Sequence, residues 1–168
     1  MLSRVRQSLK LNVRALHVEA QIEKMGLVLP PQGQPKGTYR SVVQTGKYLF
    51  LAGHLPQPAG DKPLITGKVG RDLTTEEANE AAKIVGLNII ATLKNHLGDL
   101  DRVKRIVKLV GFVNCVDDYK EQPLVINGCS NLLGEVFGDK GTHARSAVGT
   151  NALPLGVSVE IEAIVEVE

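Results

Sequence analysis

The segment HARSAVGTNALPLGVSVEIEAIVEVE, residues 143–168, carries the most regular pattern in the sequence. From residue 157 to residue 165, apolar side chains recur at every second position, with glutamates among the residues between them. Because neighbouring residues of a strand point to opposite faces, this alternation predicts a strand over 156–167 with one buried face. A second strand is predicted over 144–151, and the short Leu-Pro-Leu spacer between the two indicates a hairpin.

Upstream of this segment, predicted helices and strands alternate along the chain. Two long helices are predicted, because apolar residues recur with helical spacing after a capping threonine at 74 or 75 and after Pro123. The predicted elements are a short helix at 18–29, strands at 39–44 and 47–52 with a turn at Thr45-Gly46, a short strand at 64–66, a helix from 74 or 75 to about 96, a central strand at 102–116 and a helix at 122–137.

This order predicts one α+β domain in which two main helices pack on one face of the sheet. The other face would leave an exposed apolar surface, which is uncommon on a monomer. The sequence therefore predicts an oligomer that covers the open face of the sheet. A loop with three prolines and two glycines at 30–37 separates the short N-terminal helix from the rest.

Charge is unevenly distributed along the 168 residues, whose net charge is +2. Arg4, Arg6, Lys10 and Arg14 precede the first acidic residue, Glu19, so the remaining chain carries about −2. A slightly acidic body argues against a nucleic-acid partner. No apolar run approaches the roughly 20 residues of a membrane span, so no membrane partner is expected.

The N-terminal segment has two interpretations. Residues 1–17 are basic, lack acidic residues and have apolar residues at helical spacing, as in a mitochondrial targeting segment. If the source is eukaryotic, this segment predicts a mitochondrial location. For any other source, a cytoplasmic location is predicted. The alternative is a basic amphipathic first helix of the folded protein. The predicted organisation is a targeting segment at 1–17, a helix and Pro/Gly loop at 18–36, and a domain at 37–168.

Several motifs of the domain resemble one known family in the same order. ARSAVGTNALPLGVSVEIEAIVEV is similar to its closing pattern of A-R-S, L-P and V-E-I-E-A-I, GTYRSVVQTGKYLFLAGHLP to its opening pattern, and VINGCSNLLGEVFG to its second helix. The chain thus resembles the reactive-intermediate deaminases, also called Rid or YjgF-like proteins or endoribonuclease L-PSP. The resemblance implies a chorismate-mutase-like fold, a homotrimer with a central β-barrel, and clefts between subunits. The implied reaction is cofactor-free hydrolysis of enamines or imines, such as 2-aminoacrylate, to 2-oxo acids and ammonia.

Three residues are predicted to be catalytic. Arg145 matches the arginine of the family that binds the substrate carboxylate, and a guanidinium suits this role because it pairs a carboxylate with two hydrogen bonds. Glu160 matches the glutamate that orients water, and imine hydrolysis needs a group that moves protons. Tyr39 matches the tyrosine of the opening motif. The alternatives are a surface ion pair for Arg145, a solvated strand face for Glu160 and a structural aromatic for Tyr39.

Four further residues are predicted to contact the substrate. Asn127 matches the asparagine of the second helix, and Ala52, Gly53 and Ala147 match positions that line the cleft. Many members have serine at the position of Ala52 and cysteine at the position of Ala147, so this chain lacks two polar side-chain groups. His54 could add a titrating group. The histidines show no spacing that indicates a metal site, and none is expected.

Two other functions compete with deamination. A trimer of the same fold could bind a small carboxylate without turnover, which Ala52 and Ala147 favour. An endoribonuclease is the third hypothesis, and the acidic body and the absence of a basic–aromatic stripe argue against it.

Overall fold

The structure, a computed structural model, describes residues 17–31 and 37–168. Except for His17, the predicted targeting segment lies outside the described residues. The described elements are α1 Val18–Lys24, β1 Val42–Thr45, β2 Tyr48–His54, α2 Thr75–Leu97, η1 Leu100–Arg102, β3 Val103–Asn114, α3 Gln122–Phe137, η2 Gly138–Gly141, β4 Ala144–Thr150, η3 Pro154–Gly156 and β5 Val159–Val167. Within this part of the chain, no helix is both long enough and apolar enough to cross a membrane.

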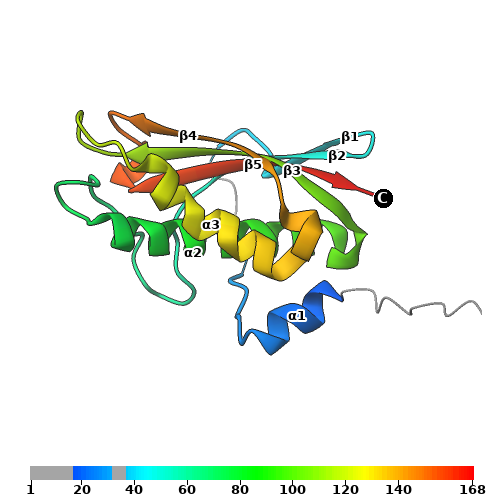
Figure 1. The fold of residues 1–168 in the computed structure, drawn as a ribbon. Coiled ribbons are helices and arrows are strands. Elements are labelled where there is room, and N and C mark those ends of the chain that lie inside the picture. The colour runs from blue at the N-terminus through cyan, green and yellow to red at the C-terminus, as the bar shows by residue number, and fades with distance from the viewer. Residues whose placement is uncertain (1–16, 32–36) are drawn as a thin grey trace, which may run out of the picture.

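A five-stranded mixed sheet forms one layer and the two long helices form the other (Figure 1). The strand order is β1-β2-β5-β3-β4, in which β3 and β4 are parallel and all other neighbours are antiparallel. Helices α2 and α3 lie side by side under the same face of the sheet, as the sequence predicts. The alternating residues of β5, from Val159 to Val167, point into the core between these layers.

Local sequence signals explain both long helices. A capping box starts α2, because the Thr74 side chain accepts from the Glu77 N–H while the Glu77 carboxylate accepts from the Thr74 N–H. Pro123 occupies the first turn of α3, where its missing N–H has no cost. The helices also pack closely, since a Cβ at Gly128 would overlap with the backbone oxygen of Asn79 on α2. This close contact fixes α3, which supports the edge strand β4.

Two predicted strand features are wrong. Residues 64–66 form no strand, and only Thr66 makes an isolated bridge, to Val157. The predicted hairpin of the C-terminal segment is also wrong, because β3 lies between β4 and β5. Their connection is not a tight turn: it contains η3, and Leu155 there has a positive φ of 59°. This longer connection takes the chain past the end of β3.

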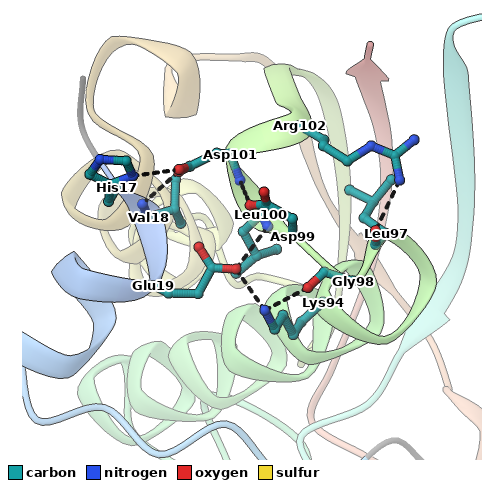
Figure 2. A network of polar contacts seen from close by, with 10 residues as sticks. All are labelled: His17, Val18, Glu19, Lys94, Leu97, Gly98, Asp99, Leu100, Asp101 and Arg102. Carbon is teal, nitrogen blue, oxygen red and sulfur yellow. Dashed lines mark hydrogen bonds and ion pairs between the residues drawn. The ribbon is translucent and has the colours of Figure 1, made fainter.

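Helix α1 belongs to the same core and is held by polar contacts to η1 (Figure 2). The Asp101 carboxylate accepts from the Val18 N–H at 2.8 Å. In return, the Glu19 carboxylate accepts from the Leu100 N–H at 2.9 Å and from Lys94 Nζ at 2.7 Å. Each short element therefore satisfies backbone donors of the other.

Candidate functional site

Arg145 lies on the edge strand β4, and its side chain points to the sheet face that carries the helices. Its Nη1 donates to Asn127 Oδ1 at 2.8 Å and to Ser130 Oγ at 3.0 Å, both on α3. Among the residues that the structure describes, no carboxylate pairs with Arg145. The half-buried guanidinium is thus oriented through one nitrogen. Its Nε–Nη2 edge has the geometry to bind a carboxylate with two hydrogen bonds.

His143 extends this group of residues from the start of β4. Its Nε2 lies 3.0 Å from Ser130 Oγ, and its Nδ1 lies 2.6 Å from the Gly141 carbonyl oxygen. Burial lowers the pKa of His143, the Gly141 carbonyl opposes this effect, and the charge of Arg145 lowers the pKa further. The imidazole is therefore neutral at pH 7. We call Asn127, Ser130, His143 and Arg145 the arginine group.

Glu160 lies on β5 in the middle of the sheet and on its open face. Its neighbours Val159 and Ile161 are fully buried on the helix face, so the glutamate points the other way. Its carboxylate lies against the backbone of Gly53, where a Cβ on the glycine would overlap with Oε1. Burial raises the pKa of Glu160, and the nearby charge of Glu162 raises it further. A half-buried carboxylate with a raised pKa suits proton transfer near neutral pH.

A pocket of about 380 Å³ opens beside the end of β2 and is lined by Tyr39, Ala52 and Gly53. His54 and Thr92 form its inner wall. The His54 Nδ1 lies 2.7 Å from the Ala52 carbonyl oxygen and its Nε2 lies 2.8 Å from Thr92 Oγ1, so both ring nitrogens have partners. Burial lowers the pKa of His54, against the effect of the Ala52 carbonyl. We call Tyr39, Ala52, Gly53 and Glu160 the glutamate group.

The two groups do not meet within one chain. Arg145 lies in register with Leu109 of β3, whereas Glu160 lies in register with Phe112 of the same strand. With β3 between them, their Cα atoms are about 14 Å apart, from two strand spacings and three residues. They also point to opposite faces. The predicted hairpin of residues 144–151 and 156–167 would have paired Glu160 with Arg145 across its two strands, and this pairing is wrong.

The remaining predicted contact residue, Ala147, lies on the same face of β4 as Arg145. It pairs with Gly111 of β3 and packs against the hydrophobic core. Its side chain therefore touches the apolar interior, next to the arginine group. The structure places Asn127 and Ala147 near Arg145, and Tyr39, Ala52 and Gly53 near the pocket.

Sequence reasoning missed Ser130 and His143. Two spacings carried the signal: Ser130 follows Asn127 by three residues on a helix, and His143 precedes Arg145 by two residues on the way into a strand. Each spacing places the pair on one face of its element. Apart from these residues, Glu19, Asp99 and Asp101 form an acidic cluster, whose carboxylates already accept hydrogen bonds that hold α1 and η1.

Comparison with known proteins identifies the family. Residues 19–166 match the family model described as "YjgF/chorismate_mutase-like, putative endoribonuclease". The chain belongs to this family. The match includes both residue groups and, except for the first residue of α1 and the last of β5, every helix and strand of the described fold.

Proteins similar to this chain differ in their descriptions. Protein TCP17 of Trypanosoma cruzi is 42% identical over 151 residues, which are 89% of this chain and 93% of that protein. A 2-iminobutanoate/2-iminopropanoate deaminase of Dermatophagoides farinae is 27% identical over 139 residues, 83% of this chain and 93% of that protein. A crystal structure of a protein of unknown function from Agrobacterium tumefaciens superposes with a TM-score of 0.82 at 42% identity, covering 90% of this chain and 94% of that one.

Proposed function

We propose that this protein hydrolyses reactive enamines and imines of amino acids, such as 2-aminoacrylate, to 2-oxo acids and ammonia. The observation that carries the proposal is Arg145: its guanidinium is half-buried, is oriented by α3, and has no carboxylate partner among the described residues. Such a group binds a small carboxylate strongly. Family membership and a deaminase among the relatives support the choice of reaction.

The proposed mechanism gives each group one task. Arg145 holds the substrate carboxylate, and Asn127 keeps the guanidinium in place. An enamine substrate first tautomerises to the imine. Glu160 takes a proton from the water that attacks the imine carbon and passes it to the nitrogen, which gives a carbinolamine. The proton of the new hydroxyl then moves to the nitrogen through Glu160, the C–N bond breaks, the oxygen becomes the carbonyl of the 2-oxo acid and ammonia leaves. The raised pKa of Glu160 helps both steps, since its conjugate acid persists closer to neutral pH. Tyr39 walls the pocket in which the side chain of the substrate lies.

Because the two groups face opposite sides of one sheet, the mechanism needs two copies of the chain. We propose a homotrimer in which the open sheet faces form a central β-barrel. In this proposal, the arginine group of each copy lies at the subunit boundary, beside the glutamate group of the next copy. Exposed apolar residues on the open face, such as Phe50 at 45% and Val148 at 45% exposed, support this assembly. In a eukaryotic source we place the trimer in mitochondria, and otherwise in the cytoplasm.

A turnover assay tests the reaction. A PLP-dependent dehydratase generates 2-aminoacrylate, and its disappearance is followed with and without the purified protein. Wild type should accelerate the loss, and Arg145→Ala should behave like the uncatalysed reaction, with Arg145→Lys intermediate because an ammonium cannot make the bidentate pair. If wild type gives no acceleration, or if Arg145→Ala equals wild type, the proposed reaction is wrong.

Mixing two inactive variants tests the shared site. Arg145→Ala and Glu160→Gln are each expected to be inactive alone. When subunits exchange, a site with both intact residues forms at about a quarter of interfaces in a random equal mixture. Recovery of activity on mixing supports a site built from two copies. If mass spectrometry shows that the subunits have exchanged and activity still does not recover, the shared site is wrong.

A carboxylate-binding trimer without turnover is the second candidate. Ala52 and Ala147 favour it, because neither offers the side-chain polar group that many members carry there. Calorimetry with 2-oxobutyrate, run beside the turnover assay, separates the two functions. Binding that depends on Arg145 without any acceleration would support the binding protein.

A further inference from the structure

Hydrogen-bond directions in the arginine group follow from its chemistry. The Gly141 carbonyl oxygen can only accept, so the His143 Nδ1, 2.6 Å away, carries a proton. In the neutral ring Nε2 is then an acceptor, and the Ser130 hydroxyl, 3.0 Å away, donates to it. Ser130 Oγ in turn accepts from Arg145 Nη1 at 3.0 Å. A series of hydrogen bonds therefore runs from Arg145, which donates to Ser130, to His143, which accepts from Ser130.

This series of hydrogen bonds disfavours a second proton on His143. A proton on Nε2 would turn that nitrogen into a donor, so the Ser130 hydroxyl would lose its acceptor there and would have to accept from two cations, Arg145 and His143. The imidazolium would also lie near the guanidinium, with no carboxylate beside Arg145 among the described residues to offset the two charges. Burial and the Arg145 charge both lower the pKa of His143, which agrees with this geometry.

Within residues 17–31 and 37–168, the groups around His143 offer no other control of its charge. Helix α3 contributes Ser130, which is uncharged, and next to it Cys129, whose pKa burial raises to about 12, so that it stays a neutral thiol. The segment before β4 contributes the Gly141 carbonyl, and β4 contributes Arg145. On the neighbouring β3, the Lys108 Nζ donates to Ser146 Oγ, which lies on the opposite face from Arg145.

We propose that His143 takes up a proton when a carboxylate binds Arg145, with Ser130 as the hydroxyl that links the two. The inference rests on the carboxylate site of the proposed function. A bound carboxylate cancels the guanidinium charge, and it draws Arg145 toward itself, so that Ser130 Oγ accepts from a protonated Nε2 without a second cation beside it. The proton comes from solvent, and no covalent bond changes. By linkage, the affinity for the carboxylate rises as pH falls, by at most about tenfold per pH unit.

Calorimetry of the full chain with 2-oxobutyrate tests the coupling. Titrations in two buffers of different ionisation enthalpy near pH 7 should report uptake of a fraction of one proton per site. His143→Gln keeps a polar group near Ser130 but cannot titrate, so the buffer dependence and most of the pH dependence should disappear. His96→Gln is the matched control, because that histidine is exposed on α2 and should leave both unchanged.

A spectroscopic titration keeps the test independent of how the variants fold. Ring resonances of the four histidines in the wild-type protein, followed against pH, should show a higher pKa for one histidine alone, His143, when 2-oxobutyrate is present. If 2-oxobutyrate binds without proton uptake and moves no histidine pKa, this inference is overturned while the carboxylate site stands. If it does not bind at all, the carboxylate site fails and the inference with it.

Discussion

The arginine group and the glutamate group are held by the fold in different ways. Arg145 is on an edge strand and is positioned by side chains of α3, so its place depends on hydrogen bonds between two elements. Glu160 is on a central strand and is positioned by the backbone of Gly53. The first arrangement can adjust to a ligand, whereas the second leaves the carboxylate little room to move.

Electrostatics separates the two groups as well. The arginine group contains a positive charge and a histidine that stays neutral, and it lacks a carboxylate among the described residues. The glutamate group contains a carboxylate whose pKa is raised by burial and by Glu162. An anionic substrate is attracted by the first and repelled by the second, which fits a division into binding and proton transfer. Four experiments can break or sharpen this comparison.

Gly53→Ala should give the largest effect. The new methyl group would overlap with the Glu160 carboxylate, which must move away from the strand. Losing a positioned proton-transfer group lowers turnover by about 100-fold or more, while binding of 2-oxobutyrate at Arg145 should persist. The 2-aminoacrylate assay measures the turnover, and calorimetry measures the affinity for 2-oxobutyrate.

Gly134→Ala is the matched control, because a Cβ there meets nothing within 4 Å and the helix gains an alanine. It should keep full activity and melt no earlier than wild type. Wild-type turnover in Gly53→Ala would show that Glu160 has no role in the reaction.

Asn127→Asp and Asn127→Ala form the next pair. The alanine removes one hydrogen bond to the guanidinium, and 2-oxobutyrate should bind about tenfold more weakly. The aspartate puts a negative charge at the same place and competes with the ligand carboxylate, so its effect should be larger. Calorimetry distinguishes them, and equal affinities would argue that Asn127 orients Arg145 without lying beside the bound carboxylate.

How far the sequence could predict the site depends on the range of each signal. Helix α3 was predicted at its observed bounds, because Pro123 and the apolar spacing are local features. The family motifs singled out Asn127 and Arg145 separately, and the structure joins them by a hydrogen bond. By contrast, the β4–β5 hairpin was predicted wrongly, since the alternation within a strand says nothing of which strand lies beside it.

For Ser130 and His143, the spacings in the sequence indicate which face of its element each residue shares with Asn127 or Arg145, but not the contacts between the two elements. Both are ordinary polar residues, and their significance comes from hydrogen bonds between α3 and the start of β4, 13 residues apart. The close fit of Gly53 to Glu160 joins two strands more than 100 residues apart in the chain. Only the packing of distant segments reveals such pairs.

Glu162→Gln should produce a smaller change, confined to pH dependence. Removing its charge takes away one of the two causes that raise the pKa of Glu160 and leaves burial, the larger one. The limb of the pH–rate profile that reports Glu160 should therefore move to lower pH, with maximal turnover within about twofold of wild type. Glu76→Gln, on α2, is the control and should leave the profile in place. An unchanged profile in Glu162→Gln would assign that limb to another group.

Lowering the pH should have the smallest effect through the contacts that hold helix α1. The pKa values of the carboxyls there, Glu19 and Asp101, are lowered, whereas that of Glu160 is raised. A hydrogen bond from the Val18 N–H, and a smaller one from His17, lower the pKa of Asp101. Burial raises the pKa of Glu19, but hydrogen bonds from Leu100 and Lys94 outweigh it and the net shift is downward.

Carboxyls with lowered pKa stabilise the folded state fully above their ordinary pKa of about 4, and this stabilisation is lost as pH falls through the lowered values. Glu160, with its raised pKa, instead favours the folded state at low pH and loses that contribution as pH rises. The protection of α1 from hydrogen exchange, relative to the intrinsic exchange rate at each pH, should therefore fall selectively below pH 4. Asp101→Asn should lower this protection by about two- to fivefold at pH 7, as expected for a partly exposed polar contact. Equal exchange in both proteins would mean that the buried Val18 and Ile22 hold α1 without help from its carboxylates.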